Sequence, residues 1–249
     1  MTWGWFARPA NIRIDALFSH SVAVPRLHPV FFAILALLLG ILPGQAVAQS
    51  ATKPTPGFIR VRLETDMGNI VLALNQRRAP KTVANFMIYV DDGRLDGTSF
   101  YRAFRRKNDP KSGFIQGGID TEARRVYFPQ VELEPTDQTG LKHLDGTISM
   151  ARHKDPNSGT GNFSIQVGAN PTLDARPGYA GYAAFGQVVA GMDVVKRIMA
   201  RDTCCGRGVM FGQMIKDRVA IKRAVRLDGK AKPSGTVKPW LVAPRGAIR

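Results

Sequence analysis

Gly113-Phe-Ile-Gln-Gly-Gly118 opens with a short strand-like run, residues 113–116. Similar short runs lie on both sides of it and are separated by loops rich in Gly, Pro, Asn and Asp; they span residues 98–104, 146–151, 162–167, 183–188 and 215–223. Short strands with turn residues between them favour a closed barrel or a sandwich.

The segment before these runs predicts a hairpin. In Phe58-Ile-Arg-Val-Arg-Leu-Glu-Thr65 apolar residues alternate with charged ones, which is the pattern of a half-buried strand. A turn at residues 66–69 then leads to a second strand at 70–74. Apolar residues at helical spacing predict two helices, one from Pro80 to near Gly93 and one over residues 191–200. These helices are too few for a doubly wound parallel sheet.

The N-terminus resembles a secretion signal. Val30-Phe-Phe-Ala-Ile-Leu-Ala-Leu-Leu-Leu-Gly-Ile-Leu42 is a run of thirteen apolar residues. As a helix it would reach only about 20 Å, short of the roughly 30 Å hydrocarbon core of a bilayer. Pro43-Gly44 ends the run, and Ala46-Val-Ala48 has the small-x-small pattern of a cleavage site. We expect residues 1–48 to be removed and the product to enter a bacterial periplasm or be secreted; an uncleaved membrane anchor is the alternative.

The charge excess is concentrated near the C-terminus. The formal net charge is +16, and residues 201–249 hold twelve Lys/Arg against three Asp/Glu. We expect a linker at 49–57, a domain at 58–226 and a basic disordered tail at 227–249. Such a tail is either simply solvated or weakly attracted to an anionic surface. Because no basic stripe interleaved with aromatic residues occurs, we expect no specific nucleic-acid partner.

Cys204 and Cys205 are adjacent and are the only cysteines. Their Cα atoms are about 3.8 Å apart across a trans peptide, below the usual disulfide range of roughly 4.4–6.8 Å. A vicinal disulfide, two free thiols and an intermolecular bridge all remain open. Because no Cys-x-x-Cys or Cys/His zinc spacing is present, we expect no metal site.

Six short motifs carry the functional information. They are Phe100-Tyr-Arg102, Gly113-Phe-Ile-Gln-Gly-Gly118, Gly146-Thr-Ile-Ser-Met-Ala151, Gly161-Asn-Phe-Ser-Ile165, Leu173-Asp174 and Phe185-Gly-Gln-Val-Val-Ala-Gly-Met-Asp-Val-Val195. No Ser-His-Asp or Cys-His set and no phosphate-binding loop is evident.

In this order and spacing, the motifs resemble the cyclophilin family of peptidyl-prolyl isomerases, most of all its bacterial members with secretion signals. The resemblance implies a mainly β fold: a closed eight-stranded antiparallel β-barrel capped by two α-helices. It implies rotation of X-Pro bonds in proline-containing polypeptides, here unfolded or folding exported proteins. It implies no cofactor, and we expect a monomer.

The resemblance also assigns roles to individual positions. Arg102 matches the family's catalytic arginine, and Gln116 matches the glutamine of its Gln-Gly-Gly run. Phe114 and Leu173 match apolar side chains that line the proline pocket. Ala151 lies where the family offers backbone to the substrate chain.

Other positions depart from the family pattern. Arg152 replaces the usual asparagine, and Tyr182 replaces a histidine. Asn162 stands where Gln or Glu is usual, Ser164 where a phenylalanine floors the proline pocket, and Thr172 where a large aromatic is usual. We still expect Arg152, Asn162 and Tyr182 to contact substrate. The departures leave an alternative open, a module that binds proline segments as a chaperone or assembly subunit with little turnover.

Overall fold

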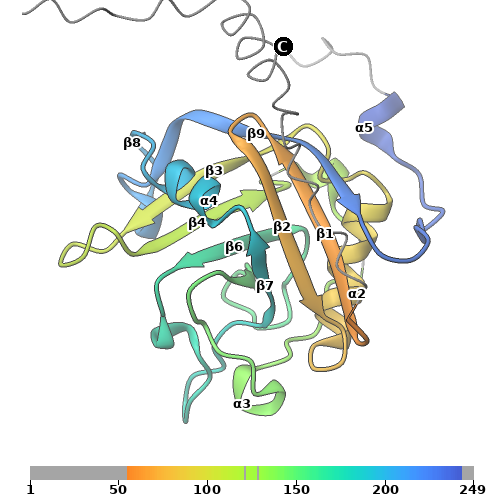
Figure 1. Cartoon of the computed structure of the whole chain (residues 1–249), viewed down its shortest axis with the longest axis horizontal. Helices are drawn as coiled ribbons and strands as arrows, with labels where there is room; N and C mark the ends of the chain where they lie inside the picture. Colours follow the sequence, from red (N-terminus) through yellow and green to blue (C-terminus); the bar gives the residue numbers. More distant parts are fainter. Residues whose placement is uncertain (1–54, 121, 128, 243–249) are drawn as a thin grey trace, which may run out of the picture. The chain divides into compact units, whose positions relative to one another are not determined.

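The computed structural model describes residues 55–120, 122–127 and 129–242, so the expected signal at 1–48 lies outside the described residues. Its strands form one antiparallel sheet in which β1 pairs with both β2 and β9, and this closes the barrel (Figure 1). The strands are β1 (Phe58–Thr65), β2 (Gly68–Asn75), β3 (Thr98–Arg105), β4 (Gly113–Gly118), β5 (Thr147–Met150), β6 (Asn162–Val167), β7 (Ala184–Ala190), β8 (Thr203–Cys204) and β9 (Met214–Arg226).

Eight of these strands make the barrel, in the order β1-β2-β7-β5-β6-β4-β3-β9, and the two-residue β8 pairs with the start of β9. The predicted eight-stranded antiparallel barrel is therefore confirmed. The predicted hairpin is β1 and β2, in which Leu63 lies opposite Ile70 and both side chains are fully buried. Strand alternation thus explains which face of the hairpin enters the core.

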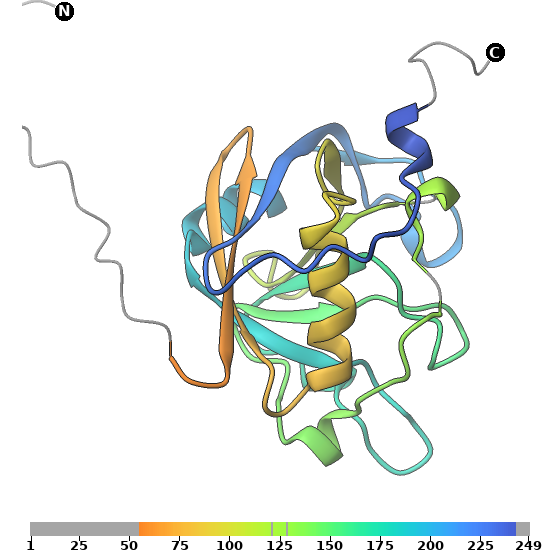
Figure 2. The same cartoon turned by 90° about the vertical axis from the view of Figure 1, so that its right-hand side faces the viewer.

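Two longer helices pack against the barrel, α2 (Pro80–Asp91) and α4 (Met192–Met199), as the helical spacing predicts. Helix α2 crosses the strands in Figure 2, and its Phe86 ring contacts the rings of Phe163 and Phe185 at 5.4 and 5.3 Å. Short helical turns are η1 (Ala123–Arg125), α3 (Thr136–Thr139), η2 (Pro171–Leu173), η3 (Gly208–Met210) and α5 (Pro239–Val242). Among the described residues, no helix has the length and apolarity needed to cross a bilayer.

The C-terminal segment 227–242 is not the disordered tail that its composition predicts. The Ser234 hydroxyl donates to the Asp92 carboxylate at 2.6 Å, just beyond the end of α2. The Trp240 ring lies 4.8 Å from the guanidinium carbon of Arg94, a residue with only 2% of its surface exposed. The prediction of disorder is therefore wrong for residues 227–242. The contacts are polar and cation–π, and they leave no hydrophobic periodicity for sequence analysis to detect.

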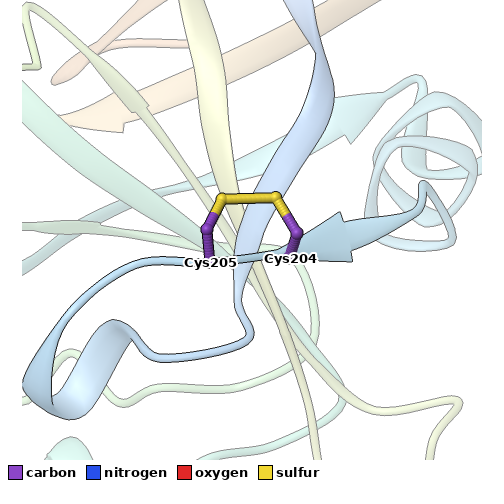
Figure 3. The surroundings of a disulfide bond; sticks show 2 residues. All are labelled: Cys204 and Cys205. Carbon is purple, nitrogen blue, oxygen red and sulfur yellow. A yellow bond between two sulfur atoms is a disulfide. The ribbon is translucent and has the colours of Figure 1, made fainter.

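Cys204 and Cys205 form a vicinal disulfide (Figure 3), one of the three states that the sequence leaves open. Cys205 has a positive φ of 38°. Its carbonyl accepts a hydrogen bond from the Gly212 N–H at 2.5 Å. The disulfide therefore stands at the start of a closed loop, residues 205–213, that leads into β9.

Candidate functional site

Strands β3 and β4 place the predicted catalytic residues side by side. In their antiparallel register Arg102 lies opposite Gln116, and Phe104 lies opposite Phe114. The intervening Ile115 is fully buried in the core, so the residues on either side of it in β4 face away from the barrel interior. The site is thus on the outer face of the wall formed by these two strands, which lie next to each other in Figure 1.

Three side chains hold the Arg102 guanidinium. Its Nη1 donates to Gln116 Oε1 at 2.9 Å, and its Nε and Nη2 donate to Gln213 Oε1 at 2.9 and 2.7 Å. Its carbon lies 5.0 Å from the centroid of the Phe114 ring. Burial lowers the pKa of Arg102 from its ordinary value, but arginine is protonated so strongly that it stays charged at physiological pH.

A β-bulge brings a second neighbour to Gln116. The register shifts between Phe100 and Arg102, so Tyr101 is the extra residue of β3. The Tyr101 hydroxyl accepts from Gln116 Nε2 at 2.8 Å and donates to Asn162 Oδ1 at 3.3 Å. Burial raises the pKa of Tyr101, so its phenol remains a donor. The amide of Gln116 therefore has one orientation, with its oxygen toward Arg102.

Aromatic rings form the apolar part of the site. The Phe104 and Phe114 rings lie 5.3 Å apart, and both residues are half-buried. Ser164 lies opposite Gln116 on β6, and its hydroxyl accepts from Gln166 Nε2 at 3.1 Å. The phenylalanine that the family places at Ser164 is thus absent, while Phe104 adds a ring beside Phe114.

Three other predicted residues, Arg152, Leu173 and Tyr182, lie outside the strands. The Arg152 guanidinium stacks on the Tyr182 ring at 4.5 Å and donates from Nη2 to the Gly181 carbonyl at 2.8 Å. The Tyr182 N–H donates to the Leu173 carbonyl at 3.0 Å. Arg152, Tyr182 and Leu173 therefore form a second group, for which the structure shows no hydrogen bond or ring contact to Arg102 within residues 55–242.

Asn162 connects Tyr101 to Ala151, the residue before Arg152. Its carbonyl accepts from the Ala151 N–H at 2.9 Å, and its side chain accepts from Tyr101 and from the Asp120 N–H. Its Nδ2 donates to the Asp120 carbonyl at 3.1 Å. Both ends of the Asn162 amide are therefore engaged by the protein, and its predicted contact with substrate remains a prediction.

A Ser-His-Asp arrangement, which the sequence does not make evident, includes Ser149 of β5, which lies opposite Ser164 of β6. His143 Nδ1 is 2.7 Å from Asp174 Oδ1, and its Nε2 is 2.8 Å from Ser149 Oγ. His143 and Ser149 are each 1% exposed, so no substrate reaches the serine. Burial lowers the pKa of His143, and the Asp174 carboxylate opposes this shift. The trio therefore ties β5 to the turn that carries Leu173 and does not form a hydrolytic site.

Sequence analysis missed two residues of this site. Phe104 follows Arg102 by two positions in a predicted strand. Since residues two apart lie on the same face of a strand, this spacing could have placed Phe104 beside Arg102. Gln213 is separated from Arg102 by 111 positions, and no pattern in the sequence connects the two.

The comparisons with known proteins agree with this geometry. The family model described as "Cyclophilin type peptidyl-prolyl cis-trans isomerase/CLD" matches residues 60–225. The chain belongs to the cyclophilin-type peptidyl-prolyl cis-trans isomerase family. The chain is thus an enzyme of that type, and the match covers every site residue named above.

Individual cyclophilins are similar over the same region. Peptidyl-prolyl cis-trans isomerase cyp18 of Streptomyces antibioticus is 39% identical over 59% of this chain and 87% of its own length. Peptidyl-prolyl cis-trans isomerase B of Escherichia coli is 34% identical over 65% of this chain and 96% of its own length. A Cryptosporidium parvum cyclophilin crystal structure aligns with a TM-score of 0.54 at 22% identity, covering 70% of this chain and 99% of its own, and it supports the fold alone.

Proposed function

We propose that this cyclophilin rotates X-Pro peptide bonds in unfolded or folding exported proteins, with Arg102 as the catalytic donor. The observation that carries the proposal is the Arg102 guanidinium, which is held between Gln116 and Gln213 and lies over the Phe114 ring. A fixed donor beside an apolar surface is what a proline ring and its nitrogen require.

The chemistry follows from the electronic structure of the amide. Delocalisation of the nitrogen lone pair gives C–N rotation a barrier of about 18–20 kcal/mol. In the twisted transition state the prolyl nitrogen becomes pyramidal and regains its lone pair. An N–H of Arg102 can donate to that lone pair but not to the planar ground state, so the bond stabilises the transition state selectively. Each 1.36 kcal/mol removed from the barrier gives about a tenfold rate increase.

Binding would involve both groups of the site. We infer that Phe114, Phe104 and Leu173 contact the proline ring, and that Ala151 offers its backbone to the chain before it. The Ala151 N–H already donates to the Asn162 carbonyl, so the Ala151 carbonyl is the group that would accept from substrate. Arg152 and Tyr182 would border this backbone contact.

A proline-peptide isomerisation assay tests the catalytic claim. We expect the wild-type chain to accelerate isomerisation and the Arg102→Ala variant to lose nearly all of that acceleration. Arg197→Ala is the matched control, because Arg197 is half exposed and pairs with Asp193 on α4. If wild type and Arg102→Ala are equally slow but bind the peptide, the chain is the proline-binding module with little turnover.

The role with exported proteins rests on residues 1–48. Their thirteen-residue apolar run and Ala46-Val-Ala48 support cleavage after Ala48. Expression in a bacterium with a periplasm, followed by N-terminal sequencing of the periplasmic fraction, should give a product that starts at Gln49. A product that retains Met1 in the membrane fraction would instead support the uncleaved anchor.

We also propose a weak contact between the basic C-terminal segment and an anionic membrane surface. Lys230 and Lys232 are exposed. The Lys232 N–H donates to the carboxylate of Asp91, the last residue of α2, so this segment lies beside that helix. Binding to phosphatidylglycerol vesicles at low salt should weaken in the Lys230→Gln/Lys232→Gln variant and disappear at high salt. Unchanged binding in that variant would rule out these two lysines as the contact.

A further inference from the structure

We propose that Gln213 is a positioning residue for the isomerisation, because it leaves the Arg102 guanidinium with a single N–H for the substrate. The inference rests on the proposed role of Arg102. A guanidinium carries five N–H donors in a rigid plane. Gln213 Oε1 accepts from Nε and Nη2, and the Val209 carbonyl accepts from Nη2 at 3.4 Å.

Gln116 takes one of the two remaining protons, on Nη1. Four of the five donors therefore have acceptors within the described part of the chain, and the second Nη1 proton has none. Because the guanidinium is planar, fixing its Nε–Nη2 edge fixes the direction of that proton. With its hydrogen bond to Gln116 alone, the guanidinium could still rotate about that one hydrogen bond.

Gln213 is itself fixed in place. Its Nε2 donates to the Val209 carbonyl at 2.9 Å, so only its oxygen can face Arg102. Its backbone carbonyl accepts from the Ala103 N–H at 2.9 Å, and its own N–H donates to the Met210 carbonyl at 3.0 Å. The residue that directs Arg102 therefore belongs to a loop anchored on β3, the strand that carries Arg102.

Substitution of Gln213 tests this role. We expect Gln213→Leu to lower kcat/KM about tenfold while the Kd of a proline peptide, measured by NMR titration, changes less than twofold. The Arg102 Nε–H resonance should also shift. Gln213→Glu keeps the acceptor and should recover at least half of the activity. Gln187→Leu is the matched control, because Gln187 is an exposed glutamine on β7 that donates to the Asp145 carbonyl.

A double-mutant cycle separates this role from a role in folding the loop. In an Arg102→Ala background, Gln213→Leu should have no further effect on the residual rate. An equal loss in both backgrounds, or no loss in either, overturns the proposal. Activity of wild type against Arg102→Ala reports separately on the proposed function, so the two can fail independently.

A different observation on the same loop supports a second proposal. Val209 and Phe211 are 81% and 75% exposed, although both side chains are large and apolar. The Val209 carbonyl accepts a hydrogen bond from Arg102. Val209 and Phe211 therefore continue the catalytic surface on the side of β3 away from β4. We infer that Val209 and Phe211 contact an apolar substrate residue next to the proline, on the side opposite Ala151.

Peptides that differ only beside the proline test this contact. The Val209→Ser/Phe211→Ser variant should lose about fivefold in kcat/KM for a peptide with a leucine there, and less than twofold for one with a lysine. Leu144→Ser/Val189→Ser removes two apolar side chains that are 57% exposed elsewhere and serves as the control. Equal losses for both peptides, or none, overturn the proposal.

Discussion

The two groups of the site are built differently. Arg102, Gln116 and Phe114 lie on paired strands, where the β-ladder sets their spacing and other side chains fix their polar atoms. Arg152 and Tyr182 lie on loops and are held by one stacking contact and by backbone carbonyls. From this difference we propose that the strand group supplies the chemistry and the loop group adjusts substrate range, since loops tolerate change more readily than a ladder does.

The largest expected effect comes from changing the shape of the strand group without changing its charge. Arg102→Lys keeps a cation but cannot bridge Gln116 and Gln213, because an ammonium has no planar fork. We expect kcat/KM to fall about 100-fold, within the range known for loss of one preorganised donor. The measurement is the isomerisation assay, with Arg197→Lys on α4 as the control. Activity close to wild type would show that positive charge alone suffices.

A smaller effect is expected from the ring beneath the guanidinium. Phe114→Ala removes the surface that faces Arg102 and the partner of Phe104. Because Phe114 is only half-buried, we expect a loss of about tenfold in kcat/KM, near the low end of what a buried aromatic contributes. Phe58→Ala at the far end of β1 is the control. If peptide binding is unchanged, Phe114 does not form the proline surface.

A substitution in the loop group should change the affinity for peptide but not the kcat of isomerisation. Arg152→Asn restores the residue usual in the family and removes the stacking contact on Tyr182. A partly exposed cation–π contact is worth roughly 0.5–1 kcal/mol, so the peptide Kd should change by about fivefold or less. NMR titration gives Kd, and exchange spectroscopy gives kcat. A fall in kcat comparable to that of Phe114→Ala would contradict the division between the two groups.

The same division explains how far the sequence could predict the molecule. Alternation and turn residues predicted the barrel strands, and the motifs predicted Arg102, Phe114 and Gln116, since these features are local in the chain. Gln213 and the buried set of Ser149, His143 and Asp174 could not be found, because residues far apart meet only when the barrel closes. The packing of 227–242 was missed because polar contacts leave no periodic pattern.

The smallest effect is expected from the buried His143. It joins Ser149 on β5 to Asp174, the residue after Leu173. Burial lowers the pKa of His143 in the folded state, so below about pH 6.5, the ordinary histidine value, the unfolded chain binds a proton that the folded chain does not. The contribution of His143 to the free energy of unfolding should therefore be complete above pH 6.5. It should decrease as the pH falls toward the lowered pKa.

The expected slope is at most about 1.4 kcal/mol per pH unit, the value for one proton. Urea unfolding between pH 7.5 and 5 measures it. His143→Gln keeps hydrogen-bonding capacity but cannot titrate, so the slope should vanish in that variant. His153→Gln is the control, because His153 is exposed. Aspartates with lowered pKa values, such as Asp228 beside Arg60, lose their contribution only below about pH 3.8, so their effect is separate. A slope that persists in His143→Gln would show that another group titrates, and His143 would then only position the Leu173 turn.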